Sequence, residues 1–283
     1  MASRKKYLFI FLIIFILPAV AFTAEKQKQQ FPLKAALVVD SDSGKILYEH
    51  NADKLVQLAS LSKILALYLI NEDLRAGKIH LSDMVKISAN AVHTGGSKML
   101  YQEGTEARLE DLIKGMAVVS ANDATVAAAE YLAGSVNKFV ERMNAKAGEM
   151  GMSHSYFVNP HGLPDPRQLS TAHDMLILTR HYLQRFPDML NVHSLQYFRY
   201  NFVNRRNRNI LLKECPDVDG LKTGYVRVAG YHLIATAKRG NVRLIAIVLG
   251  AKNPRARADQ TSKLLDQCFR INGDQRPNSL IGS

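Results

Sequence analysis

A few residues along the chain have the types and spacing that acyl transfer needs. Ser60 precedes Lys63 by three positions, and two short sequence motifs, called words below, follow in order: S-A-N at residues 120–122 and K-T-G at 222–224. Residues i and i+3 share one face of a helix, so Ser60 and Lys63 would project together from its first turn. A nucleophile and its base require that arrangement, and the free N–H groups of a helix start can stabilise an oxyanion. Taken alone, Ser60 would be interpreted as a simple helix N-cap.

Lys63 can take the proton of Ser60 only while its own amine is unprotonated. Burial and a second cation both lower the pKa of a lysine, because each penalises the charged form, and Lys222 is the natural second cation. The predicted helix over 60–75 is apolar nearly all round, which is typical of a buried central helix. We therefore predict Ser60 as the nucleophile and Lys63 as its base.

The S-A-N word lies between two helical runs, where a loop can present side chains to a cleft. The Ser120 hydroxyl can pass a proton to a leaving amine. The Asn122 amide can both hold Lys63 and hydrogen-bond the substrate backbone. Ordinary capping of the following helix is the alternative interpretation.

The K-T-G word lies on a predicted strand and occurs once in the chain. Lys222 and the Thr223 hydroxyl can bind a substrate carboxylate. Gly224 lets the substrate lie against the strand as an added edge partner. This word therefore predicts a carboxylate-binding strand.

Further occurrences of the S-x-x-K and S-x-N motifs lie where they do not suit catalysis, and the motifs of other hydrolase classes are absent. S-x-x-K recurs at 3–6, in a targeting segment, and by chance at 135–138, while S-x-N recurs at 88–90, where helix capping is the better account. The histidines show no H-E-x-x-H spacing, and no G-x-S-x-G word is present, which argues against a metallopeptidase and an α/β-hydrolase. We expect no metal and no cofactor. Cys215 and Cys268 permit one disulfide without requiring it.

The first residues have the pattern of a secretory signal peptide. A positive region at 4–6 precedes ten apolar residues at 8–17, and an A-x-A cleavage site follows at 19–21. The apolar stretch falls short of the ~20 residues that span a bilayer, so we predict cleavage and export rather than a retained anchor. Removing 1–21 takes away three positive charges, so the formal net charge falls from +12 to +9.

The mature chain is therefore basic. That charge favours weak contact with anionic membrane lipids or cell-wall polymers, and we expect a periplasmic or other extracytoplasmic, wall-associated protein. No arginine-rich run with interleaved aromatic residues is present, so we expect no nucleic-acid binding. The densest basic patch, 205–208, is interpreted as a solvated loop.

Hairpins at both ends of the mature chain enclose a mainly helical region. Apolar, β-rich runs around turn-forming residues predict the hairpins over 33–49 and 231–250. Helical periodicity is good over 60–75, 109–119, 124–132, 136–149, 172–184 and 255–269. The pattern predicts an α/β fold of the α+β type, with one antiparallel sheet completed by both ends, flanking helices and a helical lobe. The active site would lie between sheet and lobe.

The predicted domain organisation is simple. With 283 residues and 47% apolar content, the chain is long enough for one large catalytic domain, which we place at 33–270. A linker at 22–32 would connect it to the signal peptide. The tail at 271–283 is too short and too polar for an amphipathic anchor.

With these words and elements, the chain resembles the serine-type D-alanyl-D-alanine carboxypeptidases, the low-molecular-mass penicillin-binding proteins, whose fold is β-lactamase/transpeptidase-like. The resemblance covers roughly residues 33–270. It also rests on N-D-A at 122–124, N-P-H-G-L at 159–163, S-T-A at 170–172 and V-D-G-L at 218–221.

The resemblance implies that the penultimate D-alanine of a peptidoglycan stem peptide acylates Ser60, which releases the terminal D-alanine, and that β-lactams act as covalent inhibitors. It implies an oxyanion hole made by the N–H groups of Ser60 and Tyr225. In the family a further arginine after the last strand assists the carboxylate. Arg257 is the best match, and Arg255 is a close competitor.

Two departures from the family pattern and three alternatives remain. Many relatives carry threonine where this chain has Val226, so one hydroxyl near the substrate is lost. Many also continue into a β-rich domain and an amphipathic helix, so we expect no C-terminal membrane attachment.

The alternatives are a D,D-endopeptidase that cuts cross-links, a β-lactamase, for which no E-x-x-L-N word follows Ser120, and a non-enzymatic wall-binding protein. The intact set of nucleophile, base, second serine and second lysine disfavours the last of these.

Overall fold

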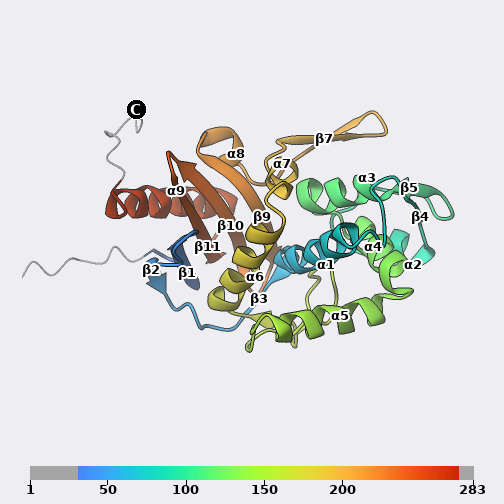
Figure 1. Ribbon diagram of the computed structural model, residues 1–283, viewed down its shortest axis with the longest axis horizontal. Helices are drawn as coiled ribbons and strands as arrows, with labels where there is room; N and C mark the ends of the chain where they lie inside the picture. Colours follow the sequence, from blue (N-terminus) through green and yellow to red (C-terminus); the bar gives the residue numbers. More distant parts are fainter. Residues whose placement is uncertain (1–30, 274–283) are drawn as a thin grey trace, which may run out of the picture. The chain divides into compact units, whose positions relative to one another are not determined.

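Strands from the two ends of the chain form one antiparallel sheet (Figure 1). The computed structural model describes residues 31–273. The strand order is β2-β1-β11-β10-β9, and β1 pairs with β11 so that Ala35 lies opposite Leu249. The bounds are β1 Ala35–Asp40, β2 Ile46–His50, β9 Val218–Val226, β10 Gly230–Arg239 and β11 Val242–Ala251. Both predicted hairpins, and the predicted sheet completed by both ends, are confirmed.

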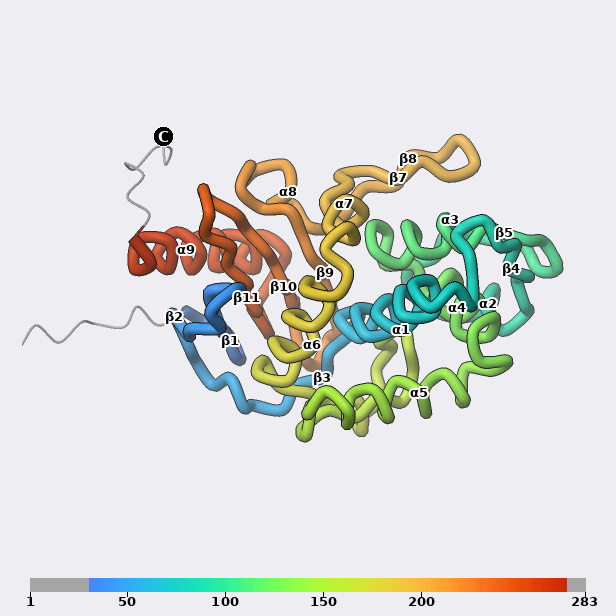
Figure 2. Tube along the Cα trace, in the orientation of Figure 1, coloured from blue at the N-terminus to red at the C-terminus, as the bar shows by residue number. Residues whose placement is uncertain are grey.

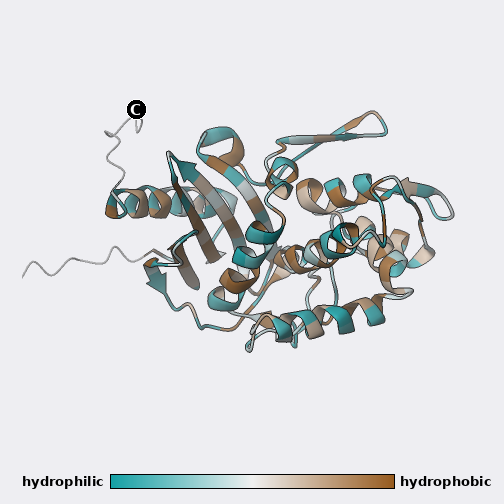
Figure 3. Ribbon diagram, viewed as in Figure 1, coloured by the Kyte–Doolittle hydropathy of each residue, from teal (hydrophilic) through white to brown (hydrophobic). Residues whose placement is uncertain are grey.

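Helices cover both faces of this sheet. Helix α6 (Ala172–Arg185) packs on one face, and the closing helix α9 (Pro254–Ile271) packs on the other (Figure 1). The central strands are therefore buried on both sides, which explains why β1 and β11 are continuous apolar runs rather than alternating ones. Figure 3 shows the same strands as mainly hydrophobic.

The helical lobe is built around one buried helix. Helix α1 runs from Lys63 to Arg75, and its first eight residues, 63–70, are all buried, as the all-round apolar pattern predicted. Figure 2 shows α1 running between the sheet and the outer helices of the lobe. The other lobe helices are α2 Ala89–His93, α3 Leu109–Lys114, α4 Asn122–Ala133 and α5 Val136–Glu149.

Two predicted helices begin or end differently from their patterns. The helix predicted over 60–75 starts with a 3₁₀ turn, η1 (Ala59–Ser62), before α1. The helix predicted over 109–119 ends at Lys114, and a π-helical turn, η2 (Gly115–Val119), follows it. Wider and tighter turns of this kind keep the apolar residues facing inward, so side-chain periodicity does not reveal them.

Several short elements were not predicted. They are β3 Val56–Gln57, β4 Met84–Lys86, β5 Glu106–Arg108, β6 Leu169–Ser170, β7 Tyr197–Tyr200, β8 Val203–Arg206, α7 Met189–His193 and α8 Leu211–Glu214. Elements of two to five residues are too short for a periodic pattern to appear. One of them corrects an expectation, because the patch at 205–208, interpreted as a solvated loop, begins in strand β8.

The predicted domain limits are only partly within the described residues. The signal peptide at 1–21 and most of the linker lie outside them, as does the tail from 274 onward. From Pro32 the chain forms one compact unit, and α9 continues to Ile271, just past the predicted limit at 270. Cys215 and Cys268 are free, so the permitted disulfide does not form in this structure. Among residues 31–273, no helix combines the length and apolar character needed to cross a membrane.

Candidate active site

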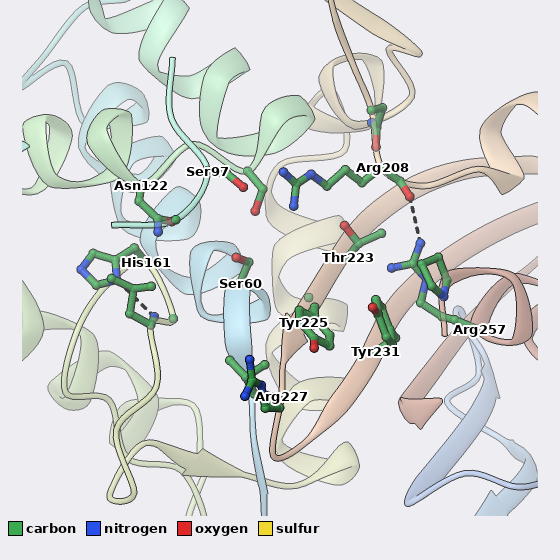
Figure 4. Close-up of a pocket in the computed structure, with 18 of the residues that line it drawn as sticks. Ser60, Ser97, Asn122, His161, Arg208, Thr223, Tyr225, Arg227, Tyr231 and Arg257 are labelled. Atoms are coloured by element: carbon green, nitrogen blue, oxygen red, sulfur yellow. Dashed lines mark hydrogen bonds between the residues drawn. The ribbon is translucent and has the colours of Figure 1, made fainter. Parts of the chain in front are cut away.

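A cavity of about 700 Å³ opens between the edge strand β9 and the helical lobe (Figure 4). Its walls contain most of the predicted site residues: Ser60, Ser120, Asn122, Thr223, Gly224, Tyr225 and Arg257. The two predicted lysines are buried directly behind these walls. Nζ of Lys63 lies 3.2 Å from Oγ of Ser60, and Nζ of Lys222 lies 2.9 Å from Oγ of Ser120. The fold therefore brings the three sequence words to one place.

Ser60 lies in the 3₁₀ turn η1, at the base of the cavity. The residue before it, Ala59, has a φ of +51°, a backbone conformation that costs a non-glycine residue free energy. Ser60 is not the N-cap of either helical segment: Leu58 precedes η1 and Ser62 precedes α1, and neither caps through its side chain. The capping interpretation of Ser60 is therefore wrong, and its hydroxyl faces the cavity.

Lys63 is the centre of a small polar cluster inside the protein. Besides its contact with Ser60, its Nζ donates hydrogen bonds to Oδ1 of Asn122 at 2.7 Å and to the main-chain oxygen of His161 at 2.6 Å. Burial, and then repulsion by Lys222 and Arg208, hold the pKa of Lys63 well below its usual range. The predicted influence of Lys222 is confirmed, although burial has the larger effect. An amine in this setting is neutral at a much lower pH than an exposed lysine.

Ser120 and Asn122 lie on either side of the turn between η2 and α4, and their backbone conformations differ. Ser120 ends the π-helical turn with a left-handed backbone, φ +64° and ψ +34°, and Asn122 begins α4. The N-cap of α4 is Ala121, which has no capping side chain, so simple capping does not explain this word. Nδ2 of Asn122 donates to the oxygen of Gly95 at 2.6 Å, which turns its Oδ1 toward Lys63.

Lys222 connects the sheet to the lobe. It is 2% exposed, and its Nζ donates to Oγ of Ser120 and to the main-chain oxygen of Thr223, both at 2.9 Å. Burial, followed by repulsion from Arg208 and Arg257, lowers the pKa of Lys222 to about 7. This lysine therefore changes charge near neutral pH, and an anion bound in the cavity would favour its charged form.

Arg257, and not Arg255, faces the cavity. Nη2 of Arg257 donates to the oxygen of Arg208 at 2.8 Å, and its buried Nε has no hydrogen-bond partner among the described residues. Arg255 lies on the surface, where it pairs with Glu214 and Asp259. Figure 4 shows Arg257 and Arg208 on the Thr223 side of the cavity.

Sequence reasoning missed Arg208 and the main-chain oxygen of His161. Arg208 lines the cavity together with Arg206 and the buried Asn207, because Arg205 fixes this segment with hydrogen bonds to the oxygens of residues 98 and 99 at 3.3 and 2.9 Å. The density of arginine in the segment was the available indication. His161 belongs to the N-P-H-G-L match at 159–163, but a main-chain acceptor leaves no mark in a side-chain pattern.

Two glycines allow the chain to approach Ser60 closely. A Cβ on Gly224 would lie 3.1 Å from the oxygen of Leu58 and 3.3 Å from the nitrogen of Ser60. A Cβ on Gly162 would overlap the carbonyl group of Ala59, and Gly162 also has a φ of +86°. Gly224 was predicted to make room for the substrate. In the structure it makes room for the turn that carries Ser60.

We expect Gly162→Ala to destabilise the protein and to displace Ser60. Its added methyl group must push the Ala59 carbonyl away, which should cost at least about 2 kcal/mol beyond the cost of the positive φ. Gly151→Ala is the matched control, because Gly151 has a φ of +81° and open space around it, so only about 1–2 kcal/mol of backbone strain is expected. Urea unfolding measures both, and equal destabilisation would contradict the predicted contact.

Tyr225 lines the cavity and is 50% exposed. The ring stacks on Tyr231 of β10, with centroids 4.2 Å apart and an interplanar angle of 27°. Val226, the departure from the family pattern, is buried against Ala59 and Ala229. It therefore packs beneath the Ser60 turn.

Solved structures share this fold over most of the chain. Penicillin-binding protein 5 from Haemophilus influenzae is 39% identical with a TM-score of 0.83, covering 85% of this chain and 72% of that one. Penicillin-binding protein D2 from Listeria monocytogenes, solved in its cefotaxime-bound form, is 31% identical with a TM-score of 0.78, covering 85% of this chain and 98% of that one. The fold and the three words at the cavity define the class of the penicillin-binding proteins.

Within that class the family is also shown. Residues 21–253 match the model of the D-alanyl-D-alanine carboxypeptidase family, Peptidase_S11, and the chain belongs to it. D-alanyl-D-alanine carboxypeptidase DacF of Bacillus subtilis is 40% identical over 241 residues, which are 83% of this chain and 62% of that protein. DacC of Escherichia coli is 39% identical over 267 residues, 91% of this chain and 67% of that protein. The chain thus spans about two thirds of the length of these relatives.

Proposed function

We propose that the protein is a serine D-alanyl-D-alanine carboxypeptidase that removes the terminal D-alanine from peptidoglycan stem peptides. The observation that carries this proposal is the contact set of Lys63. A neutral amine has two N–H donors and one lone pair. The oxygens of Asn122 and His161 are acceptors at the two shortest distances, 2.7 and 2.6 Å, so the lone pair remains for the hydroxyl of Ser60 at 3.2 Å.

In the first step Ser60 attacks the carbonyl carbon of the penultimate D-alanine. Its Oγ forms the new C–O bond while its proton passes to Nζ of Lys63. The carbonyl oxygen becomes an oxyanion, which the N–H groups of Ser60 and Tyr225 stabilise. Asn122 holds Lys63 in place and offers an amide to the substrate backbone.

In the second step the bond to the terminal D-alanine breaks. The leaving nitrogen needs a proton, and the Ser120 hydroxyl at the cavity wall supplies it while its Oγ takes a proton from the Lys222 ammonium group at 2.9 Å. The products are an ester on Ser60 and free D-alanine. Water then hydrolyses the ester and regenerates the Ser60 hydroxyl, and the two lysines return to their starting states because Lys63 loses a proton to solvent and Lys222 regains one. A β-lactam would form the same ester and remain attached.

The terminal carboxylate of the substrate would bind beside Thr223 of β9. Thr223 and Arg257 line the cavity there, and Lys222 lies behind them with a pKa of about 7. The buried Nε of Arg257 has no partner in the described part of the chain, which fits a site that an anion completes. We place this activity outside the cytoplasm, as the predicted signal peptide implies.

We expect terminal D-alanine release from pentapeptide stems to exceed cleavage of cross-linked dimers. A site with several cationic donors discriminates against a substrate that lacks the free carboxylate, because the buried donors of the site are then left without a hydrogen-bond partner. Amidating the terminal D-alanine should lower kcat/KM by about 100-fold or more. The test measures D-alanine release from the pentapeptide and its amide, with the cross-linked dimer in parallel. Faster cleavage of the dimer would favour the D,D-endopeptidase alternative.

A further inference from the structure

The cavity carries more positive charge than one carboxylate needs. Four arginines line it, Arg206, Arg208, Arg227 and Arg257, and none of its lining residues is an aspartate or a glutamate. Arg208 and Arg257 lie together beside Thr223 (Figure 4). Arg227 lies apart from them, beyond Tyr225. A second anionic group of the substrate would explain a cation at that place.

Arg227 lies just past the end of β9 and lines the cavity beyond Tyr225. Side chains at i and i+2 of a strand share a face, so Thr223 and Tyr225 both face the cavity, and Arg227, the first residue of the turn after β9, also lines it. A peptide whose carboxylate binds at Thr223 and whose scissile carbonyl lies at the N–H of Tyr225 continues upstream toward Arg227. The four residues from Thr223 to Arg227 span at most roughly 14 Å, which is within the reach of a substrate residue two places before the C-terminal one and its side chain.

Arg227 is also free to bind. It is exposed, and no hydrogen bond or ion pair of its side chain is found among residues 31–273. Other arginines near the cavity or on the sheet are engaged: Arg205 with main-chain oxygens, Arg243 with Asp219, and Arg255 with Glu214 and Asp259. A planar guanidinium at a cavity wall suits a carboxylate, which it can bind through two parallel hydrogen bonds.

We propose that Arg227 binds a second substrate carboxylate, carried by the side chain of the residue that precedes the two D-alanines. The preferred substrate would then be a stem peptide whose residue at that position has a free side-chain carboxyl group, and the side-chain amide of that peptide would be a poorer substrate. This inference rests on the proposed function, because it uses the substrate direction that the carboxypeptidase reaction sets.

The test compares two tripeptides, diaminopimelyl-D-alanyl-D-alanine with both amines acetylated and the side-chain carboxyl either free or amidated. With wild type, kcat/KM for D-alanine release should be about tenfold higher for the free acid, mainly through KM. In Arg227→Gln this ratio should fall to nearly one, with turnover of the amidated peptide unchanged. Arg227→Lys should keep part of the preference, because the charge remains while the paired hydrogen bonds are lost.

Arg199→Gln is the matched control, since Arg199 is exposed on β7 and does not line the cavity. Arg199→Gln removes the same charge and should leave the ratio of the two kcat/KM values unchanged. The rate of penicillin labelling should be the same in Arg227→Gln as in wild type. Equal turnover of the two peptides by wild type, or an unchanged ratio in Arg227→Gln, would overturn this inference alone. No D-alanine release from either peptide by penicillin-reactive wild type would overturn the proposed function and the inference with it.

Discussion

Ser60→Ala is expected to lose covalent labelling by a fluorescent penicillin completely and to lower D-alanine release by about 10⁴-fold or more. The substitution removes the hydroxyl that would form the ester, which is the one that lies beside Nζ of Lys63, at 3.2 Å. Lys63 would keep two of its three hydrogen-bond partners, Asn122 and His161. The polar cluster should therefore survive the change.

The fold should be unaffected, because the change removes one part-exposed hydroxyl from a short turn. Thermal unfolding of Ser60→Ala should match wild type within a few degrees. Ser62→Ala is a useful comparison, since Ser62 is buried and its Oγ donates to the oxygen of Ala59 at 3.0 Å. It should lower stability while leaving labelling in place. Labelling of Ser60→Ala with an adduct mapped to another residue would refute the assignment of the nucleophile.

Long, locally patterned elements could be predicted from the sequence. Helix α5 has the bounds expected from its periodicity, 136–149, and the 231–250 hairpin forms around its turn as predicted. The start of α6 is also decided locally, because the Thr171 hydroxyl accepts a hydrogen bond from the N–H of Asp174, three residues later, at 3.1 Å. Ser88 caps α2 in the same way, which confirms the capping interpretation of the second S-x-N word. In each case the residues that decide the structure are neighbours in the chain.

The rest depends on contacts between distant segments. Nothing near Gly162 in the sequence shows that Ala59 will lie against it, and Gly224 was assigned to the substrate for the same reason. The patch at 205–208 looked solvated because its charges are dense, whereas hydrogen bonds of Arg205 to a loop more than 100 residues away turn it toward the cavity. The motifs identified the chemistry and the influence of Lys222 on Lys63, whereas the contribution of Arg208 appeared only in the tertiary structure.

Lys63→Arg is expected to slow acylation by about 10³-fold although it keeps the positive charge. A guanidinium does not lose its proton at working pH, so it cannot take the proton of Ser60. Arginine is also larger than the fully buried lysine, so thermal unfolding must accompany the kinetics. Lys63→Met supplies a neutral variant of similar length. A folded Lys63→Arg variant that acylates at the wild-type rate would exclude Lys63 as the base.

The pH dependence of acylation separates a base from a lysine with only a structural role. The fraction of neutral Lys63 grows as pH rises through its lowered pKa, so the rate should rise with pH and then level off. Lys222 has a pKa of about 7 and is charged on the acid side of that value, where it repels a protonated Lys63. Lys222→Met removes this repulsion, which raises the pKa of Lys63 and should move the rising limb to higher pH. Arg255→Met, which removes a surface cation paired with Glu214, should leave the limb where it is. A limb that also stays in place in Lys222→Met would mean that Lys222 does not set the protonation of the base.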